Sequence, residues 1–293
     1  MSSRGLSLVG FMDHLHAIAH LRFACVPADP SDAALAAEWQ KSILKLQLVN
    51  IPTPGRPNIQ QIPASDQHYI QDFIREPWVR TELQSLHTTY QFMLVEIDPL
   101  LSFQHVVNLD RVDHHFRSLP RTIGTSDLLP ICLPTAQQTE DLYVSPVVSD
   151  SHSVIIKSRN TGLNRTIAGV FPLDLAGYRT HLAGMRFDFS QPCVHVVQFR
   201  GRCYLHNGFH RAIGARRAGA THVPCIFRTV NDYNEVGVRS DGNTFTAKEL
   251  DSATPPCPPT VGHFTQGGAW DVALRNVSRI LHVTWSEHTV PDE

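Results

Sequence analysis

One stretch of the sequence decides the fold: Cys203-Tyr204-Leu205-His206-Asn207-Gly208-Phe209-His210-Arg211. Its apolar start predicts a β-strand, and the Asn-Gly pair predicts a tight turn. The residues from Phe209 to Ala218 then predict a short helix, with Gly219 at the position of a left-handed C-terminal cap. A helix that begins directly behind such a turn presents unpaired backbone N–H groups and the positive end of its dipole, which together favour a phosphate.

The segments around this stretch predict further strands. Residues 194–199 and 202–205 flank Arg200-Gly201, which predicts a β-hairpin with a two-residue turn. Residues 223–227 predict a returning strand, and residues 92–98 predict an earlier one.

Two helical regions precede the expected strands. Apolar residues recur at helical spacing from 31 to 48, where Ser31 or Asp32 is placed to cap the helix. Residues 66–89 also have helical character, but Pro77 is expected to divide them into two helices. A helical N-terminal region is therefore expected.

Proline-rich connections indicate how the chain divides. The prolines between 52 and 63 predict a surface connection and a boundary, and residues 123–189 predict strands joined by loops. Residues 276–285 form a final apolar element whose type the sequence leaves open. The expected parts are a helical N-terminal region at 1–90, a core at 91–230 with a loop-rich insertion at about 120–190, and a C-terminal extension at 231–293.

Composition limits the possible classes of protein. The chain has 293 residues, 42% of them hydrophobic and 18% charged, which is enough to bury a large core. The formal net charge of -2 gives no general basic surface, so nucleic acid is not an expected partner. No apolar run approaches the roughly 20 residues that cross a bilayer. Charged residues also interrupt the first 27 residues, so we expect a cytoplasmic, soluble protein that has no membrane segment.

Cysteine and histidine are not arranged as metal sites in the sequence. The 6 cysteines are scattered without a C-x-x-C pair, so reduced thiols are expected. The 17 histidines contribute to two clusters, but neither has the H-E-x-x-H spacing of a zinc protease. We interpret both clusters as solvated or hydrogen-bonded side chains and expect no metal site: Asp13, His16 and His20, and Asp113, His114 and His115.

The stretch described first resembles the ParB/sulfiredoxin superfamily, whose members place a hairpin, a G-x-[HR]-R turn and a helix against a small mixed sheet. The resemblance covers residues 194–228, with a weaker echo at 94–107, which is less than half of the chain. It implies an α+β fold in which helices flank a small mixed sheet. In that superfamily the turn and the helix start bind nucleotide phosphates, of CTP in the chromosome-partitioning members and of ATP in sulfiredoxin and related kinases. The resemblance implies that Gly208 lets the backbone approach a phosphate and that His210 and Arg211 donate to its oxygens. The expected phosphate-binding set is Asn207, Gly208, Phe209, His210 and Arg211.

Departures from the family pattern limit what the resemblance implies. Sulfiredoxins have a reactive cysteine directly before His-Arg, whereas this chain has Phe209, so a sulfiredoxin-type reductase is not expected. Cys203 lies upstream on the expected strand, where a packed thiol is the better interpretation. Partitioning proteins have an acidic residue and two arginines at the turn and a DNA-binding region downstream, and this chain matches neither feature.

Each of these residues also has a purely structural interpretation. Gly208 serves the turn alone, His210 bonds a neighbouring carbonyl, or Arg211 pairs with a surface carboxylate. Phe209 either stacks on a base or packs against the sheet. Arg216 and Arg217 lie beyond the first helical turn and are interpreted as solvated charges.

Two functions remain open from the sequence. The first is a nucleotide-binding module in which ATP or CTP, with magnesium, controls an unidentified partner. The alternative is an ATP- or CTP-dependent phosphotransferase or hydrolase, which needs a carboxylate to take a proton. Glu96 and Asp98, in the weaker echo, are the candidate catalytic bases, while capping by Asp98 and solvent exposure of Glu96 are the alternatives.

Overall fold

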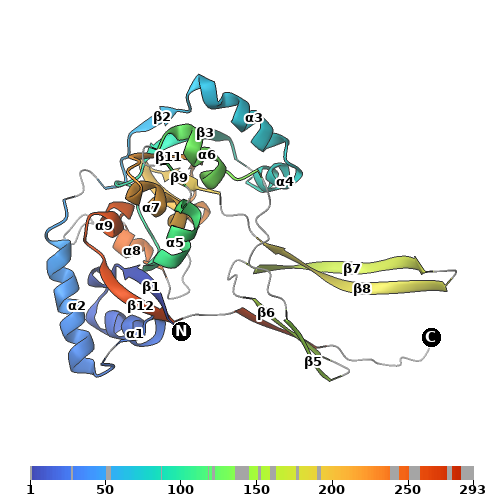
Figure 1. The fold of residues 1–293 in the computed structure, drawn as a ribbon, viewed down its shortest axis with the longest axis horizontal. Helices are drawn as coiled ribbons and strands as arrows, with labels where there is room; N and C mark the ends of the chain where they lie inside the picture. The colour runs from blue at the N-terminus through green and yellow to red at the C-terminus, as the bar shows by residue number, and fades with distance from the viewer. Residues whose placement is uncertain are drawn as a thin grey trace. The chain divides into compact units, whose positions relative to one another are not determined.

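The structure is a computed structural model, shown in Figure 1. It describes the chain except residues 1, 28, 51–53, 87, 118, 121–122, 136–144, 151–152, 159–162, 176–177, 190–192, 238–243, 251–257, 276–278 and 285–293. For residues 85, 145–189 and 279–284 it describes the backbone alone. The chain forms two compact units, the first made of 1–136 and 192–276 and the second of 137–191 and 277–293.

A mixed five-stranded sheet is the centre of the first unit, and its strand order is β10-β9-β11-β3-β2. Only β9 and β11 run parallel, and the other neighbours are antiparallel. The strands expected from the sequence are confirmed, and β9 pairs with β10 as the expected hairpin. Its turn residues Arg200 and Gly201 both have positive φ angles (49° and 74°), as a two-residue hairpin turn requires. The strands are β2 (Ile59–Gln61), β3 (Tyr90–Glu96), β9 (His195–Phe199), β10 (Arg202–Asn207) and β11 (His222–Val230).

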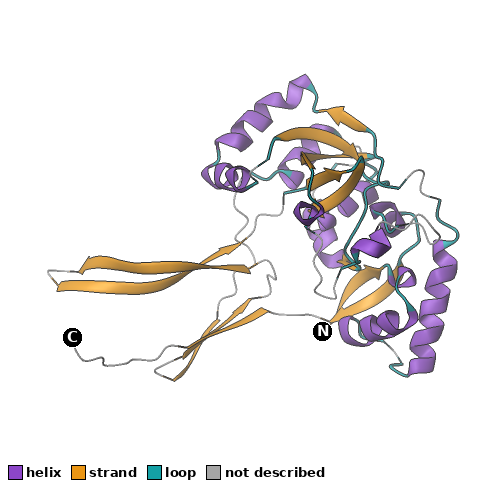
Figure 2. Cartoon of the chain, turned by 180° about the vertical axis from the view of Figure 1, so that it is seen from behind, coloured by secondary structure: helices purple, strands orange, loops and turns teal. Residues whose placement is uncertain are grey.

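Helices cover both faces of this sheet. Successive residues of a strand point to opposite faces, and Cys225 and Ile226 of β11 accordingly belong to two different apolar clusters. Cys225 packs in the larger cluster, which includes Ile213 of helix α7 (Phe209–Arg217). Ile226 packs in the smaller one, with residues of α3 (Gln67–Arg75), α4 (Pro77–Ser85) and α6 (Thr125–Cys132). An α+β fold is therefore confirmed, and Figure 2 shows its helices and strands from behind.

The local signals for helices are confirmed as well. Ser31 caps α2 (Asp32–Leu46) by accepting a hydrogen bond from the Ala34 backbone N–H. Pro77 begins α4, since the backbone at Glu76 is extended. Gly219 has a φ of 102° and ends α7, and Ala220 N–H donates to the Ala215 carbonyl as in a Schellman cap.

A second sheet joins the beginning of the chain to its later part. Its order is β12-β1-β4, where β1 (Ser2–Ser7) lies antiparallel to both β12 (Trp270–Arg275) and β4 (Val106–Asn108). The remaining helices of the unit are α1 (His14–Ala24), α5 (Leu109–Phe116), α8 (Ala247–Leu250) and α9 (Val261–Thr265), with 3-10 turns η1 (Val9–Phe11), η2 (Ala64–Asp66) and η3 (Tyr233–Val236). Side chains of β1, α1, α2 and α9 all belong to the larger apolar cluster.

The division of the chain differs from the one expected. Residues 1–90 are not a separate helical region, because β1 pairs with β12 and β2 is a strand of the central sheet. The proline-rich connection at 52–63 is no boundary either, since Gly55 N–H donates to the Pro99 carbonyl and Cys203 N–H donates to the Gly55 carbonyl. Long-range strand pairing, which no local pattern reveals, overrides the boundary.

The second unit consists of β-strands, as expected for the middle of the chain. Strands β5 (Ser145–Asp150) and β6 (Ser153–Ser158) form an antiparallel sheet with β13 (Arg279–Thr284), so the apolar element left open at 276–285 contains a strand. Strands β7 (Leu163–Leu175) and β8 (Tyr178–Phe189) form a hairpin with an irregularity between Ile167 and Val170. The insertion therefore pairs with a strand from the expected C-terminal extension.

Helices able to span a membrane are not found in the described part of the chain.

Candidate functional site

The turn between β10 and α7 has the geometry that requires glycine. Gly208 has a φ of 84°, and a Cβ atom added there would lie 2.7 Å from the Val194 Cα. Its N–H donates to the side-chain oxygen of Asn207, 2.8 Å away. Its carbonyl accepts from the N–H groups of both Arg211 and Ala212, at 3.0 and 2.9 Å. The turn therefore joins strand and helix without a loop.

The first turn of α7 keeps two backbone donors. The first N–H groups of a helix have no carbonyl one turn earlier to bond. Here the Gly208 carbonyl, at the N-cap, accepts from the Arg211 and Ala212 N–H groups. The N–H groups of Phe209 and His210 are the remaining two. The phenyl ring of Phe209, however, is 3% exposed and packs edge-on against Phe103 with centroids 5.2 Å apart. Phe209 therefore packs in the core, which was one of its two interpretations, and does not offer a face to a base.

The imidazole of His210 is neutral and accepts a hydrogen bond. Its Nε2 lies 3.3 Å from the backbone nitrogen of Asn108, the N-cap of α5, whose N–H donates to it. Burial, and to a smaller extent the basic groups of Arg111, His115 and Arg211, lower the pKa of His210 to about 3. A ring that accepts through Nε2 carries its hydrogen on Nδ1. His210 thus bonds a backbone N–H, whereas the structural interpretation named a carbonyl.

Arg211 lies inside the protein. Its side chain is 1% exposed, and burial lowers its pKa. Two thiols act electrostatically on Arg211 and raise its pKa slightly: Cys132, at the end of α6, and Cys193, just before β9. An interior guanidinium is not displayed to a phosphate in solvent, so the structure differs from the expectation that Arg211 donates to a phosphate from the protein surface.

The two candidate bases lie away from this turn. Asp98 accepts two hydrogen bonds from Arg216 Nε, each 2.9 Å long, and others from Thr265 Oγ1 (3.2 Å) and Gln266 Nε2 (2.9 Å). Arg216 is in the last turn of α7, about 12 Å along the helix from Gly208 at 1.5 Å per residue. Glu96 accepts from the Asn58 backbone N–H at 2.9 Å, next to β2. The structure does not bring either carboxylate to the turn.

These contacts also correct the alternatives given for Asp98 and Arg216. Asp98 does not cap a following helix but connects the end of β3 to α7 and α9, and its carbonyl accepts from the Gly262 N–H. Arg216 is not simply solvated, because it forms the ion pair with Asp98 in which the two side chains are only 30% and 18% exposed. Helical spacing predicts contacts only between residues three or four positions apart, so it could not predict a partner 118 residues away in the sequence.

The cysteines in the described part of the chain are packed thiols. Cys203 is 1% exposed, and burial raises its pKa to about 12, so it is not a nucleophile at neutral pH. Cys25, Cys132, Cys193 and Cys225 are also buried and free. Cys257 lies outside the described residues. The packed-thiol interpretation of Cys203 is therefore confirmed.

Side chains of both histidine clusters form hydrogen bonds or ion pairs with neighbouring residues. His16 Nδ1 lies 2.7 Å from Asp13, and His20 Nε2 lies 3.1 Å from Ser7 Oγ. Asp113 forms an ion pair with Arg4. Within the described residues, no three histidine, cysteine or acidic side chains are grouped to hold a metal ion.

Sequence reasoning missed the contribution of α5 to this site. Asn108 donates its N–H to His210 and accepts from the Asp110 and Arg111 N–H groups, so the starts of α5 and α7 meet. An asparagine followed by an acidic first turn is a signal for a helix start, but its proximity to residue 210 has no local signal. Arg111 and His115 of α5 therefore join the candidate site as basic groups that act electrostatically on His210.

Comparison with family models, with curated proteins and with solved structures finds no match to this chain.

Proposed function

We propose that the start of α7 binds the phosphate groups of a nucleoside triphosphate and that the chain acts as a ligand-controlled binding module. The observation that carries the proposal is the geometry of the helix start. Gly208 has a φ of 84°, and its carbonyl accepts from the Arg211 and Ala212 N–H groups, so the acceptor at the N-cap does not serve the N–H groups of Phe209 and His210. Such N–H groups and the positive end of the helix dipole together favour a phosphate.

The donors and charges beside the turn also support phosphate binding. Gly208 leaves the N–H groups of Phe209 and His210 at the helix start, where a phosphate oxygen accepts them. The ring of His210 adds an Nδ1–H donor, because Asn108 holds its Nε2 as an acceptor. Arg111 is exposed and supplies the charge that a ligand meets from solvent, while Arg211 contributes its field from the interior.

A binding module fits the residues better than an enzyme does. Transfer or hydrolysis of a phosphoryl group requires a group that orients or deprotonates the nucleophile at the phosphate. Glu96 and Asp98 are engaged elsewhere, and Asp98 pairs with Arg216, which lies about 12 Å along α7 from Gly208. We therefore assign no catalytic base and expect magnesium to bind with the nucleotide rather than on the chain.

A charge reversal on α5 tests the proposal. ATP, CTP, GTP and UTP with magnesium are each titrated into the wild-type chain by calorimetry, with inorganic triphosphate as a probe for phosphate alone. We expect binding by at least one of them and a loss of roughly tenfold or more in affinity for Arg111→Glu, because an attraction becomes a repulsion.

Arg117→Glu is the matched control for this experiment. It makes the same change of charge at the C-terminal end of α5, about 9 Å further along the helix, where it should have little effect. The proposal fails if none of the five compounds binds, or if the two variants lose affinity equally. Release of phosphate from a bound triphosphate would instead favour the enzyme.

A further inference from the structure

Two buried cysteines stand where the chain leaves the first unit and where it returns to it. Cys132 is the last residue of α6, and the first part of the unit ends at residue 136. Cys193 comes directly after the return of the chain at residue 192 and shortly before β9. In the sequence the two cysteines therefore bracket the whole insertion at 137–191.

A backbone hydrogen bond joins the chain at these two points. The Val194 N–H donates to the Cys132 carbonyl, with the nitrogen and the oxygen 2.8 Å apart. The nitrogen of Val194 is bonded to the carbonyl carbon of Cys193, so the two cysteines lie on either side of this bond. In paired strands such residues have Cα atoms about 5 Å apart. Disulfides need a Cα separation of roughly 4.4–6.8 Å, so the backbone spacing suits one.

Further hydrogen bonds hold the chain beside the pair. The Tyr69 hydroxyl of α3 donates to the Leu133 carbonyl at 2.8 Å. The Val194 carbonyl accepts from the Ile226 N–H of β11 at 2.9 Å. One crossing is thus held by α3 and the other by the central sheet, and this arrangement keeps the two backbones together without a covalent link.

The two thiols share one electrostatic environment. Cys132 is 0% exposed and Cys193 is 4% exposed. Burial raises the pKa of both thiols to about 12, and Arg211 lowers both values to a smaller extent. The side chains belong to different apolar clusters, so one of them must turn about its Cα–Cβ bond to bring the sulfur atoms together.

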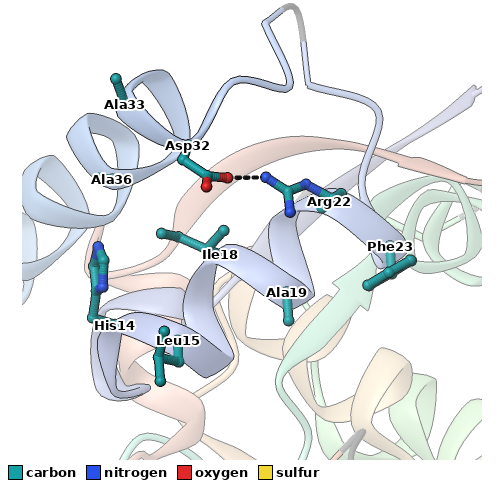
Figure 3. Close-up of a pocket in the computed structure, with 9 residues that line it drawn as sticks. All are labelled: His14, Leu15, Ile18, Ala19, Arg22, Phe23, Asp32, Ala33 and Ala36. Carbon is teal, nitrogen blue, oxygen red and sulfur yellow. Dashed lines mark hydrogen bonds and ion pairs between the residues drawn. The ribbon is translucent and has the colours of Figure 1, made fainter.

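A hollow in the surface of the first unit lies elsewhere. Figure 3 shows this space of about 500 Å³ between α1 and α2, where Arg22 and Asp32 form an ion pair. Cysteine is not among the residues that line it. Because Cys132 and Cys193 are enclosed, the reaction partner that the fold gives each of them is the other thiol rather than a bulky substrate.

We propose that Cys132 and Cys193 are a redox pair whose disulfide links the two points where the chain crosses between its units. As the S–S bond forms, the two thiols lose two protons and two electrons. A disulfide oxidant such as oxidised glutathione takes them up and is cleaved to two thiols. The link closes a loop of residues 133–192 and restricts that loop in the unfolded chain. This proposal does not depend on phosphate binding.

Another pair of buried thiols serves as an internal control. Cys203 raises the pKa of Cys225, so these two thiols also act on each other. They lie on β10 and β11, however, and β9 runs between these strands. Strands two positions apart in a sheet are about 9.5 Å from each other, which is beyond the reach of a disulfide.

Peptide mapping of the full chain tests the pairing. The wild type is unfolded in urea and refolded in glutathione buffers from reducing to oxidising, and the remaining thiols are alkylated before digestion. We expect the Cys132–Cys193 linkage to be at least about tenfold more abundant than the Cys203–Cys225 linkage, because folding brings only the first pair within reach. The same oxidation in urea should remove this preference.

Thermal unfolding measures the effect of the bond on the fold. The melting temperature of the wild type should be higher after oxidation than after reduction, by roughly 5 °C or more. Cys132→Ala and Cys193→Ala should each lose this difference, whereas Cys203→Ala should keep it. Comparing the oxidised and reduced samples of one variant removes the effect of the substitution itself on stability.

Three results would overturn the proposal. The first is absence of the Cys132–Cys193 linkage at every glutathione ratio. The second is an equal abundance of the Cys203–Cys225 linkage after refolding. The third is a melting temperature that falls on oxidation, because the bond would then distort the fold.

Discussion

The two ends of helix α7 hold their polar side chains in different ways. At its last turn, Arg216 meets Asp98, and Thr265 and Gln266 complete the hydrogen bonds of the carboxylate. At its first turn, the Gly208 carbonyl serves the Arg211 and Ala212 N–H groups, and His210 accepts from the Asn108 N–H of α5. A carboxylate whose oxygens are engaged by several donors forms a structural connection, whereas backbone N–H groups at a helix start are available to a ligand. The contrast teaches that a conspicuous carboxylate is not by itself a catalytic one.

The largest expected effect breaks the turn at the first end. Gly208→Ala places a methyl group 2.7 Å from the Val194 Cα and forces a left-handed conformation on an L-residue. We expect the free energy of unfolding to fall by about 3 kcal/mol or more, the sum of conformational strain and a backbone clash. Urea denaturation measures it.

Gly219→Ala is the matched control for this substitution, because it imposes a similar backbone strain beyond the last turn but meets no atom within 4 Å. Its cost should stay at about 1–2 kcal/mol. Equal losses for the two variants would show that the contact with Val194 does not matter.

Acid should weaken both ends of the helix through two histidines whose pKa values are lowered in the folded protein. His210 accepts from Asn108 N–H, and His263, beside the Asp98 end, accepts from Thr260 N–H at 3.1 Å. Burial lowers their pKa values to about 3 and about 4, from 6.5 in the unfolded chain. Because the folded pKa is the lower one, the stabilisation is complete above about pH 6.5 and is lost as the pH falls towards these values.

At pH 5 each of these histidines should lower the free energy of unfolding by up to about 2 kcal/mol relative to pH 8, and His210 by less because it is partly exposed. His210→Gln and His263→Gln keep an acceptor oxygen and do not titrate, so the dependence of stability on pH should become flatter in each. His68→Gln, at an exposed position, is the control. Unchanged pH profiles in both buried variants would contradict the assignment of neutral acceptor rings.

The smallest expected effect is that of Asp98→Asn, which tests whether the last turn of α7 is structural while its first turn binds the ligand. Asp98→Asn replaces a charged acceptor by an amide, and we expect a loss of about 1–2 kcal/mol in stability, because one of the two oxygens remains. Its affinity for a nucleoside triphosphate should equal that of the wild type. Isothermal calorimetry measures the affinity, and a loss comparable to that of Arg111→Glu would return Asp98 to the phosphate site.

Local signals in the sequence predict the part of the fold that depends on local chemistry. The hairpin turn at Arg200-Gly201 and the helix end at Gly219 follow from positive φ angles, which glycine adopts most readily. The cap at Ser31 follows from a side-chain oxygen that accepts a helix N–H. The pairing of β1 with β12 and the ion pair between Arg216 and Asp98 have no such signal, because their partners lie far apart in the sequence.

The candidate site is divided in the same way. The glycine turn and the helix start follow from Asn207-Gly208, but the orientation of the residues behind them does not. In the short helix α7 apolar and basic residues alternate without a clear polar face, so the sequence does not reveal that Arg211 is buried while His210 is partly exposed. Neither does it reveal that Asn108 reaches the ring of His210 from α5.

The pairing of β1 with β12 has a consequence for the synthesis of the protein. Ser2 lies opposite Arg275, so β1 cannot meet this neighbour until about 270 further residues have been translated. At about 5–20 residues per second the delay is roughly 15 to 55 s, during which that edge has no neighbour from its own chain. Nascent chains of this protein should therefore depend on molecular chaperones more than their size alone suggests.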